Sequence, residues 1–115
     1  IRIVFPGDMT AVGWRVLLED YEFRSMLQNT NIFLASHHGR VDGYLDDIFN
    51  FCKPQIIIIS DKSIQYETQR VDYSSHATGI LWNGTGIRKV LTTRNDGKLE
   101  IALRENNSYH ITSFA

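Results

Sequence analysis

The sequence predicts an α/β domain that runs β-α-β-α-β and then ends in an antiparallel hairpin unit. Short runs of β-branched residues alternate with longer segments of helical period in the first half of the chain, which is the pattern of strands joined by helices. The third run, residues 55–60, contains four consecutive isoleucines and no polar alternation. A strand of this kind is typical of a parallel sheet that is covered on both faces.

The first strand, residues 1–5 (IRIVF), ends at a Pro-Gly turn that places Asp8 just beyond it. A helix follows, because Thr10 is a suitable N-cap and apolar side chains then recur at helical spacing. These side chains are Trp14, Leu17, Leu18, Tyr21, Phe23, Met26 and Leu27. The polar stretch EDYE interrupts the pattern, so we expect either one helix broken near Asp20 or two short helices.

Residues 31–36 (NIFLAS) predict the second strand, and residues 42–52 (DGYLDDIFNFC) predict the second helix. The apolar face of that helix comprises Tyr44, Leu45, Ile48, Phe49 and Cys52. The helix must end before Pro54, because a proline disfavours helical backbone in the residue that precedes it. Beyond the third strand, residues 62–86 are polar and have no clear period.

The C-terminal segments predict an antiparallel unit. Residues 88–94 and 98–105 flank the tripeptide 95–97 (NDG), and an Asp-Gly pair between two such segments is a strong hairpin signal. Residues 108–114 alternate apolar and polar side chains, as a strand with one buried face does. We therefore expect a hairpin and one further strand after the parallel sheet.

The composition indicates one compact domain over residues 1–115, because 115 residues with 43% hydrophobic content suit a single core. The 12 basic and 13 acidic side chains leave a net charge of −1, so nucleic-acid binding is not indicated and any such contact would be local. The single cysteine, Cys52, lies among apolar residues, which favours a buried thiol in a reducing compartment. No apolar run approaches the roughly 20 residues of a membrane span, and no signal-peptide pattern is present. We therefore expect a cytoplasmic protein.

Polar side chains gather at the predicted ends of three neighbouring strands. Asp8 follows the first strand, His37, His38 and Arg40 follow the second, and Asp61 and Tyr66 follow the third. The carboxyl ends of parallel strands share one edge of a sheet, where open α/β folds usually place their sites. Asp8 alone is equally well explained as a turn or cap residue, and a His-His-Gly turn alone is more often a solvated loop. Together, a carboxylate and an imidazole on successive strand ends favour a site for Zn²⁺, Mn²⁺ or iron.

Three motifs extend this interpretation: VFPGDM at residues 4–9, ASHHGR at 35–40 and IIIISD at 56–61. They resemble the second half of a metallo-β-lactamase-fold metallohydrolase, in the branch related to the hydrolase domain of bacterial DNA-uptake competence proteins. The segments YETQ and LTTRNDGKLEI resemble the closing part of that branch. The resemblance implies that the chain is the C-terminal half of an αββα sandwich. It also implies that Asp8 bridges metals and that His37, rather than His38, is a metal ligand.

The resemblance further implies a metal-dependent hydrolase that acts on phosphodiester or related ester bonds, with one or two zinc ions or, alternatively, manganese or iron. Asp8 and His37 would be the catalytic residues that hold the metal. From their residue types, His38 and Arg40 suit contact with an anionic group of the substrate, and a plain surface role explains them equally well. Asp61 suits the orientation of a metal ligand, although an aspartate at a strand exit is commonly a turn former. The family signature His-x-His-x-Asp-His is absent from the sequence. Because a catalytic zinc takes three protein ligands, we expect the chain alone to bind metal weakly and to be inactive or weakly active.

Two other functions stay open at the level of sequence. One is an interaction or regulatory module that keeps the fold without catalysis. The other is a phosphate or nucleotide receiver that uses Asp8 and Asp61, which leaves the His-His-Gly turn unexplained. Half of a sandwich also exposes the sheet face and edge that its other half covers. We therefore expect the chain to associate with an N-terminal half or to form a homodimer.

Overall fold

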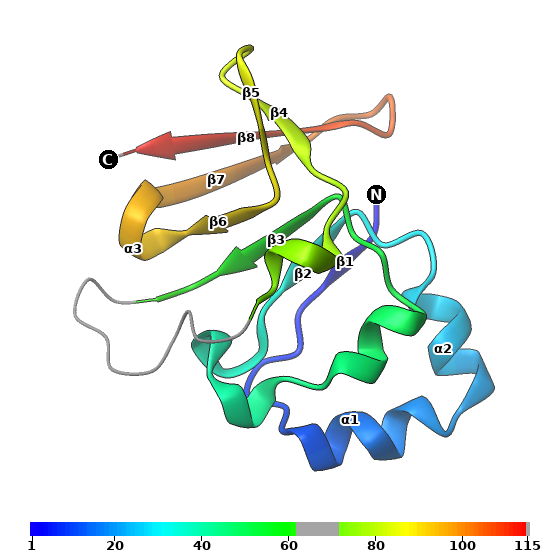
Figure 1. Ribbon diagram of the computed structural model, residues 1–115. Helices are drawn as coiled ribbons and strands as arrows, with labels where there is room; N and C mark the ends of the chain where they lie inside the picture. The colour runs from blue at the N-terminus through cyan, green and yellow to red at the C-terminus, as the bar shows by residue number, and fades with distance from the viewer. Residues whose placement is uncertain (62–71, 115) are drawn as a thin grey trace.

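The computed structural model describes residues 1–61 and 72–114. Its centre is a four-stranded sheet with the strand order β1-β2-β3-β6, in which each neighbouring pair is parallel (Figure 1). The strands are β1 (Ile3–Val4), β2 (Ile32–Leu34), β3 (Ile56–Ile59) and β6 (Val90–Thr92). All of β3 is buried. The predicted α/β class is therefore confirmed, together with the prediction that the third strand is covered on both faces.

Two apolar layers cover the two faces of this sheet. Helices α1 (Ala11–Leu18) and α2 (Tyr21–Leu27) lie on one side, and strands β7 (Lys98–Leu103) and β8 (Tyr109–Phe114) lie on the other (Figure 1). Phe33 packs in the helical layer with Trp14 of α1, at a ring-centroid distance of 6.1 Å. Its neighbour Ile32 packs in the opposite layer with Ile111 of β8. Successive side chains of β2 therefore point to opposite faces of the sheet, and both faces are apolar.

The break between α1 and α2 falls at Asp20, as the sequence predicts. The Asp20 carboxylate accepts a hydrogen bond from the Glu22 N–H at 2.9 Å and so caps the start of α2. Thr10 occupies the N-cap position of α1 but makes no side-chain cap bond. No helix within the described ranges is long and apolar enough to cross a membrane.

The predicted regular helix over residues 42–52 is wrong. The chain instead makes the short 3-10 turns η2 (Val41–Gly43) and η3 (Asp46–Asn50), with extended backbone at Tyr44 and Leu45 between them. The Gly43 carbonyl accepts a hydrogen bond from the Trp14 indole at 3.2 Å, which holds this backbone against α1. The three aspartates of the segment are also weak helix formers, because they compete for backbone hydrogen bonds. The predicted apolar face is nevertheless in the core, with Leu45, Ile48, Phe49 and Cys52 all buried.

The predicted hairpin around residues 95–97 is also wrong. Asn95 and Asp96 are instead the last two residues of the single helical turn α3 (Thr93–Asp96), and Gly97 follows it as the C-cap. This turn joins β6 to β7 without pairing the two strands. The Thr92 hydroxyl accepts a hydrogen bond from the Asn95 N–H at 3.0 Å, and the Asp96 carboxylate accepts one from the Thr92 N–H at 2.9 Å. This reciprocal capping stabilises a helical turn where the sequence also suits a β-turn. β7 pairs antiparallel with β8 instead, which confirms the last predicted strand.

A hairpin that the sequence analysis did not predict lies within the polar region before β6. Its strands are β4 (Ile80–Trp82) and β5 (Gly86–Arg88), which pair antiparallel. Asn83 and Gly84 at its tip have φ values of +51° and +73°. Both residues tolerate this left-handed backbone, which explains why an Asn-Gly pair forms the turn.

Candidate functional site

The exits of β1 and β2 meet at one edge of the parallel sheet. The His37 backbone N–H donates to the Gly7 carbonyl at 2.9 Å. The buried Ser36 hydroxyl lies 3.3 Å from the Gly7 carbonyl and makes a short hydrogen bond to the Met9 carbonyl. Both residues that flank Asp8 are thus held by the second strand exit. The Asp8 side chain is exposed and makes no ion pair or hydrogen bond to any other described residue.

The second strand exit, η1 (Ser36–Gly39), has an unusual backbone. His37, His38 and Gly39 have φ values of +49°, +57° and +78°, so three consecutive residues are left-handed. A Cβ atom on Gly39 would lie 2.9 Å from Cγ2 of Ile59, so this position needs glycine for space as well as for conformation. Left-handed backbone costs a non-glycine residue roughly 1–2 kcal/mol. Strain of this kind is concentrated at functional sites, which makes this turn a site candidate.

The His37 ring is oriented by hydrogen bonds to both of its nitrogens. Nδ1 lies 2.8 Å from Oδ1 of Asp42, and Nε2 lies 3.3 Å from Nη1 of Arg40. A guanidinium group can only donate, so Nε2 is the acceptor and Nδ1 carries the proton that is donated to Asp42. A carboxylate that holds Nδ1–H in this way is the usual partner of a histidine that binds metal through Nε2.

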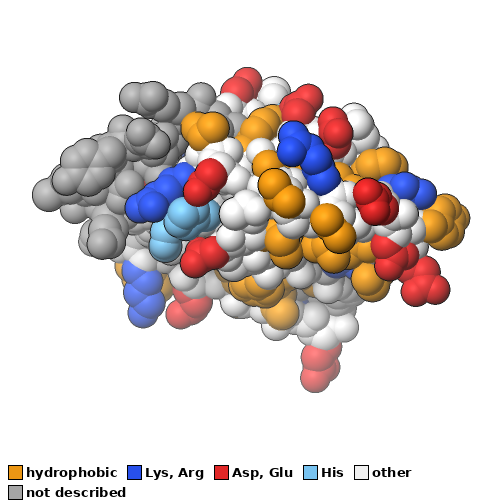
Figure 2. Space-filling model, turned by 90° about the horizontal axis from the view of Figure 1, so that it is seen from below, with side chains coloured by type: hydrophobic (Ala, Val, Ile, Leu, Met, Phe, Trp, Pro, Cys, Tyr) orange, Lys and Arg blue, Asp and Glu red, His pale blue; other side chains and the backbone are white. Residues whose placement is uncertain are grey.

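His38 makes a separate contact with the third strand exit. Its Nδ1 lies 2.7 Å from the Ser60 carbonyl, which can only accept, so Nδ1 is the donor. The His38 side chain is exposed, as is that of Arg40. Figure 2 shows histidine next to basic and acidic side chains on this face of the molecule. The predicted substrate-binding residues therefore lie beside His37 on an exposed turn.

Asp61 makes contacts that connect two elements of the fold. Its carboxylate is buried and forms an ion pair with Arg94, with Oδ2 and Nη2 2.6 Å apart. The Thr93 hydroxyl accepts from the Asp61 N–H and donates to the Asp61 carbonyl, both at 2.7 Å. These bonds join the end of β3 to α3 and give Asp61 a role in holding the fold. Tyr66 lies outside the described residues.

The donors at the strand exits fit part of a metal site. Asp8 offers carboxylate oxygens and His37 offers Nε2, which are ligands that zinc, manganese and iron accept. Within residues 1–61 and 72–114, no three His, Cys, Asp or Glu side chains form a group that could hold a metal ion. A catalytic zinc takes three protein ligands, so these two residues would need ligands from elsewhere.

Three residues of this site were missed by the sequence analysis. Ser36 clamps the Asp8 turn, Asp42 orients His37, and Gly43 allows the loop to approach Ser36. A Cβ atom on Gly43 would lie 2.9 Å from the Ser36 carbonyl oxygen. The pair Asp42-Gly43 just after the histidine turn was the available signal. The sequence analysis assigned it to the start of a helix.

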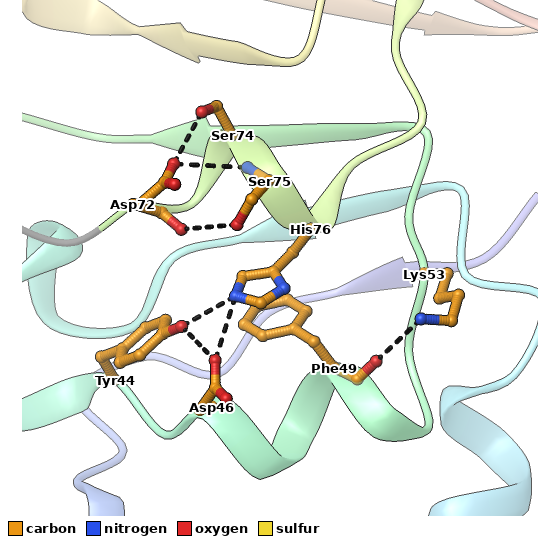
Figure 3. Close-up of polar contacts among 8 residues, drawn as sticks. All are labelled: Tyr44, Asp46, Phe49, Lys53, Asp72, Ser74, Ser75 and His76. Carbon is orange, nitrogen blue, oxygen red and sulfur yellow. Dashed lines mark hydrogen bonds and ion pairs between the residues drawn. The ribbon is translucent and has the colours of Figure 1, made fainter.

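A second polar cluster connects η3 to η4 (Ser74–His76) on the helical side of the sheet (Figure 3). The Tyr44 hydroxyl donates to Asp46 at 2.7 Å and lies 2.8 Å from Nε2 of His76. The His76 ring stacks on Phe49, with centroids 4.2 Å apart and planes within 5°. Burial, followed by the nearby Asp46 carboxylate, raises the pKa of Tyr44 well above its usual range. The phenol therefore stays protonated, and the cluster acts as a brace between two loops.

A depression of about 730 Å³ lies away from the strand exits. It is lined by residues that precede β2 and β3, including Asn31 and Gln55, and by Trp82 and Tyr109. Within it, the Tyr109 hydroxyl donates to Oε1 of Gln55 at 2.7 Å. None of the predicted site residues lines this depression. The candidate site is therefore assigned from side-chain chemistry and not from cavity size.

The chain matches no protein-family model, no curated protein and no solved structure. Its function is therefore inferred from the strand-exit geometry and the sequence motifs.

Proposed function

We propose that this chain is the C-terminal portion of a metal-dependent hydrolase of the metallo-β-lactamase fold that cleaves phosphodiester or related ester bonds. The main supporting observation is the backbone hydrogen bond from His37 to Gly7, because it brings the aspartate turn and the histidine turn to one edge of the sheet. In this proposal Asp8 would supply carboxylate oxygens and His37 would supply Nε2 to the metal, with further ligands from outside the described residues. Zinc is the expected metal, with manganese or iron as alternatives.

The layered fold supports the finer assignment to half of an αββα sandwich. Helices cover one face of the parallel sheet, and the β7–β8 hairpin covers the other. In a sandwich of this type, each sheet carries helices on its outer face and meets a second sheet on its inner face. We assign the β7–β8 hairpin to part of that second sheet because it lies on the face opposite the helices.

Each residue of the site has a defined role in the proposed reaction. When bound, the metal supplies a water molecule whose pKa is lowered to about 7. Asp42 accepts the Nδ1–H of neutral His37, which orients the ring with its lone pair on Nε2, and Ser36 holds the turn that carries Asp8. His38 and Arg40 lie on the exposed side of the same turn, where Arg40 would form paired hydrogen bonds to a phosphate oxygen pair.

The test is made in a protein that contains these residues together with a preceding half domain. Asp8→Ala is expected to remove the metal, measured by elemental analysis, and to lower phosphodiesterase turnover by at least about a hundredfold, as loss of a metal-dependent step does. Asp47→Ala, at an exposed aspartate of η3, is the matched control and is expected to leave both values unchanged. Full metal content and turnover in Asp8→Ala would contradict the assignment. A protein that holds metal at Asp8 but turns over no ester would instead favour the non-catalytic module.

A further inference from the structure

The depression beside the β4–β5 hairpin lies at the end of the parallel strands that is opposite the histidine turn. Asn31 and Gln55 line it and directly precede β2 and β3, whereas the histidine turn follows β2. Its apolar residues include Ile80 and Ile111, which belong to the core layer on the β7–β8 side of the sheet. Its volume of about 730 Å³ is within the range of small-molecule sites.

The hydrogen bonds around Gln55 leave its amide donors available to a ligand. The Arg2 backbone N–H can only donate, so the Asn31 atom that it meets at 2.7 Å is the acceptor Oδ1. The Asn31 Nδ2 then donates to Oε1 of Gln55 at 3.3 Å, and the Tyr109 hydroxyl donates to the same oxygen at 2.7 Å. The Gln55 Nε2 makes no hydrogen bond to any described residue. The depression is therefore lined by an oriented amide group with free donors.

The residues that line the depression carry little charge. In the described part of the chain they include no Asp, Glu, Lys or Arg. The amine of Ile1 is paired with an asparagine side chain, and His110 adds one imidazole. Arg88 lies over the ring of Trp82, with 5.7 Å between its guanidinium carbon and the ring centroid, and forms an ion pair with Asp96. A phosphate in the depression would therefore meet neither a lysine nor an arginine from the described lining.

We propose that the depression binds a neutral, hydroxyl-rich ligand of the pyranose class. The C–H faces of a pyranose ring suit the aromatic surfaces of Trp82 and Tyr109, and its hydroxyls both donate and accept hydrogen bonds. The free donors of Gln55 would bind one of these hydroxyls. A nucleotide or a single-stranded nucleic acid fits less well, because its phosphates need basic side chains. The site is separate from the strand exits and does not depend on the hydrolase function.

Binding is tested with the 115-residue chain and cellobiose, by following the indole N–H signals of the two tryptophans in an NMR titration. The Trp82 signal is expected to shift until it saturates, whereas the signal of Trp14, which is 1% exposed in the helical layer, stays in place. Gln55→Glu keeps an oxygen that accepts from Asn31 and Tyr109 but removes the amide donors. We expect this variant to raise the cellobiose dissociation constant by about three- to tenfold, the factor that corresponds to one lost hydrogen bond.

Two further variants complete the test. Gln28→Glu introduces the same charge at an exposed glutamine that does not line the depression. It is the matched control and is expected to leave the dissociation constant unchanged. Trp82→Leu keeps an apolar residue in β4 but removes the aromatic surface. We expect it to raise the constant by about tenfold or more, measured through the backbone amide signal of Tyr109.

A Trp82 signal that does not move at any cellobiose concentration overturns the proposal. Equal dissociation constants for the wild type and Gln55→Glu overturn it as well, because the oriented amide would then have no part in binding. A Trp82 signal that responds to uridine monophosphate and not to cellobiose would assign the depression to a nucleotide and reject the pyranose class. If Trp82→Leu does not fold, Gln55→Glu alone decides the outcome.

Discussion

At the scale of single residues, Ser36 and Gly39 shape the candidate site more than its charged groups do. The buried Ser36 hydroxyl bonds to the carbonyls on either side of Asp8, so an exposed carboxylate is held on an ordered turn. Gly39 combines a φ of +78° with close contact to Ile59. Neither residue carries chemistry of its own. Both determine where the carboxylate and the imidazole lie.

Gly39→Ala is expected to destabilise the chain by about 1–3 kcal/mol, because the added Cβ meets Ile59 and the left-handed backbone becomes strained. Urea unfolding followed by circular dichroism measures the change. Gly86→Ala is the control, because a Cβ atom on Gly86 meets no atom within 4 Å and Gly86 is not among the glycines with positive φ. Equal unfolding midpoints for the two variants would contradict this account of the turn.

At the scale of elements, the chain is held together by contacts between short loops as much as by regular structure. Tyr44 lies in the extended link between η2 and η3, and its hydroxyl joins Asp46 to His76 of η4. The Asp72 carboxylate accepts a hydrogen bond from the Ser74 hydroxyl of η4 at 2.7 Å, a bond that lowers the pKa of the Asp72 carboxyl. In the described part of these loops, hydrogen bonds link Tyr44 to Asp46 and His76, and the His76 ring stacks on Phe49.

Tyr44 makes the stability of this brace depend on pH in the alkaline range. Its pKa is raised above the ordinary value of 10.0, chiefly by burial and then by Asp46, so the folded state holds the proton more tightly than the unfolded state. The resulting stability is complete below pH 10.0 and declines as the pH rises above that value. Burial of Tyr73 acts in the same direction.

Tyr44→Phe is expected to lower the free energy of unfolding at pH 7 by about 0.5–1.5 kcal/mol, the net value of a typical hydrogen bond. It should also make the decline above pH 10.0 shallower than in the wild type. Urea titrations at a series of pH values measure both effects. Tyr21→Phe, at a tyrosine of α2 that is 73% exposed, should change neither. A wild-type stability that stays constant through the alkaline range would contradict the role given to Tyr44.

At the scale of the whole molecule, the parallel sheet is covered on both faces but has an unpaired edge at β1. In the described part of the chain, β1 pairs with β2 alone. Phe5, directly after β1, is 69% exposed. An unpaired strand edge beside an exposed aromatic residue favours association with another strand. This supports the expectation that the chain forms a homodimer or binds a separate half domain.

We expect the chain to self-associate as its concentration rises, as seen in sedimentation velocity. Phe5→Lys should weaken the association by at least about tenfold, because a lysine on an edge opposes strand pairing. Val12→Lys places the same charge on α1, at a residue that is 67% exposed, and should leave the association unchanged. A wild type that stays monomeric at all concentrations would contradict the prediction.

The predictions from sequence succeeded where a pattern was both local and strong. The isoleucines of β3 are β-branched, form a short run and have no polar interruption, which favoured a strand buried on both faces. Asp20 interrupted a helical pattern and had the right side chain for a cap. The meeting of the β1 and β2 exits also followed from the parallel order of the strands. That Asp8 and His37 bind metal stays a prediction.

The predictions failed where two local structures suited the same residues. Residues 95–97 suit either a hairpin turn or a capped helical turn. In the structure β6 pairs with β3 and not with β7, and the helical turn α3 forms after β6. Residues 42–52 have an apolar face of helical spacing, but the Trp14 indole bonds to Gly43 and holds the segment in separate turns.

The sequence by itself determined the α/β class, the buried third strand and the presence of polar groups at neighbouring strand ends, because these depend on apolar period and on turn residues close in the chain. Only the tertiary structure decided the tautomer of His37, the clamping of the Asp8 turn and the parallel pairing of β6. The clamping of the Asp8 turn and the pairing of β6 depend on hydrogen bonds between segments that are far apart in the chain. The tautomer of His37 depends on Asp42 and Arg40, whose side chains meet the ring only in the folded turn.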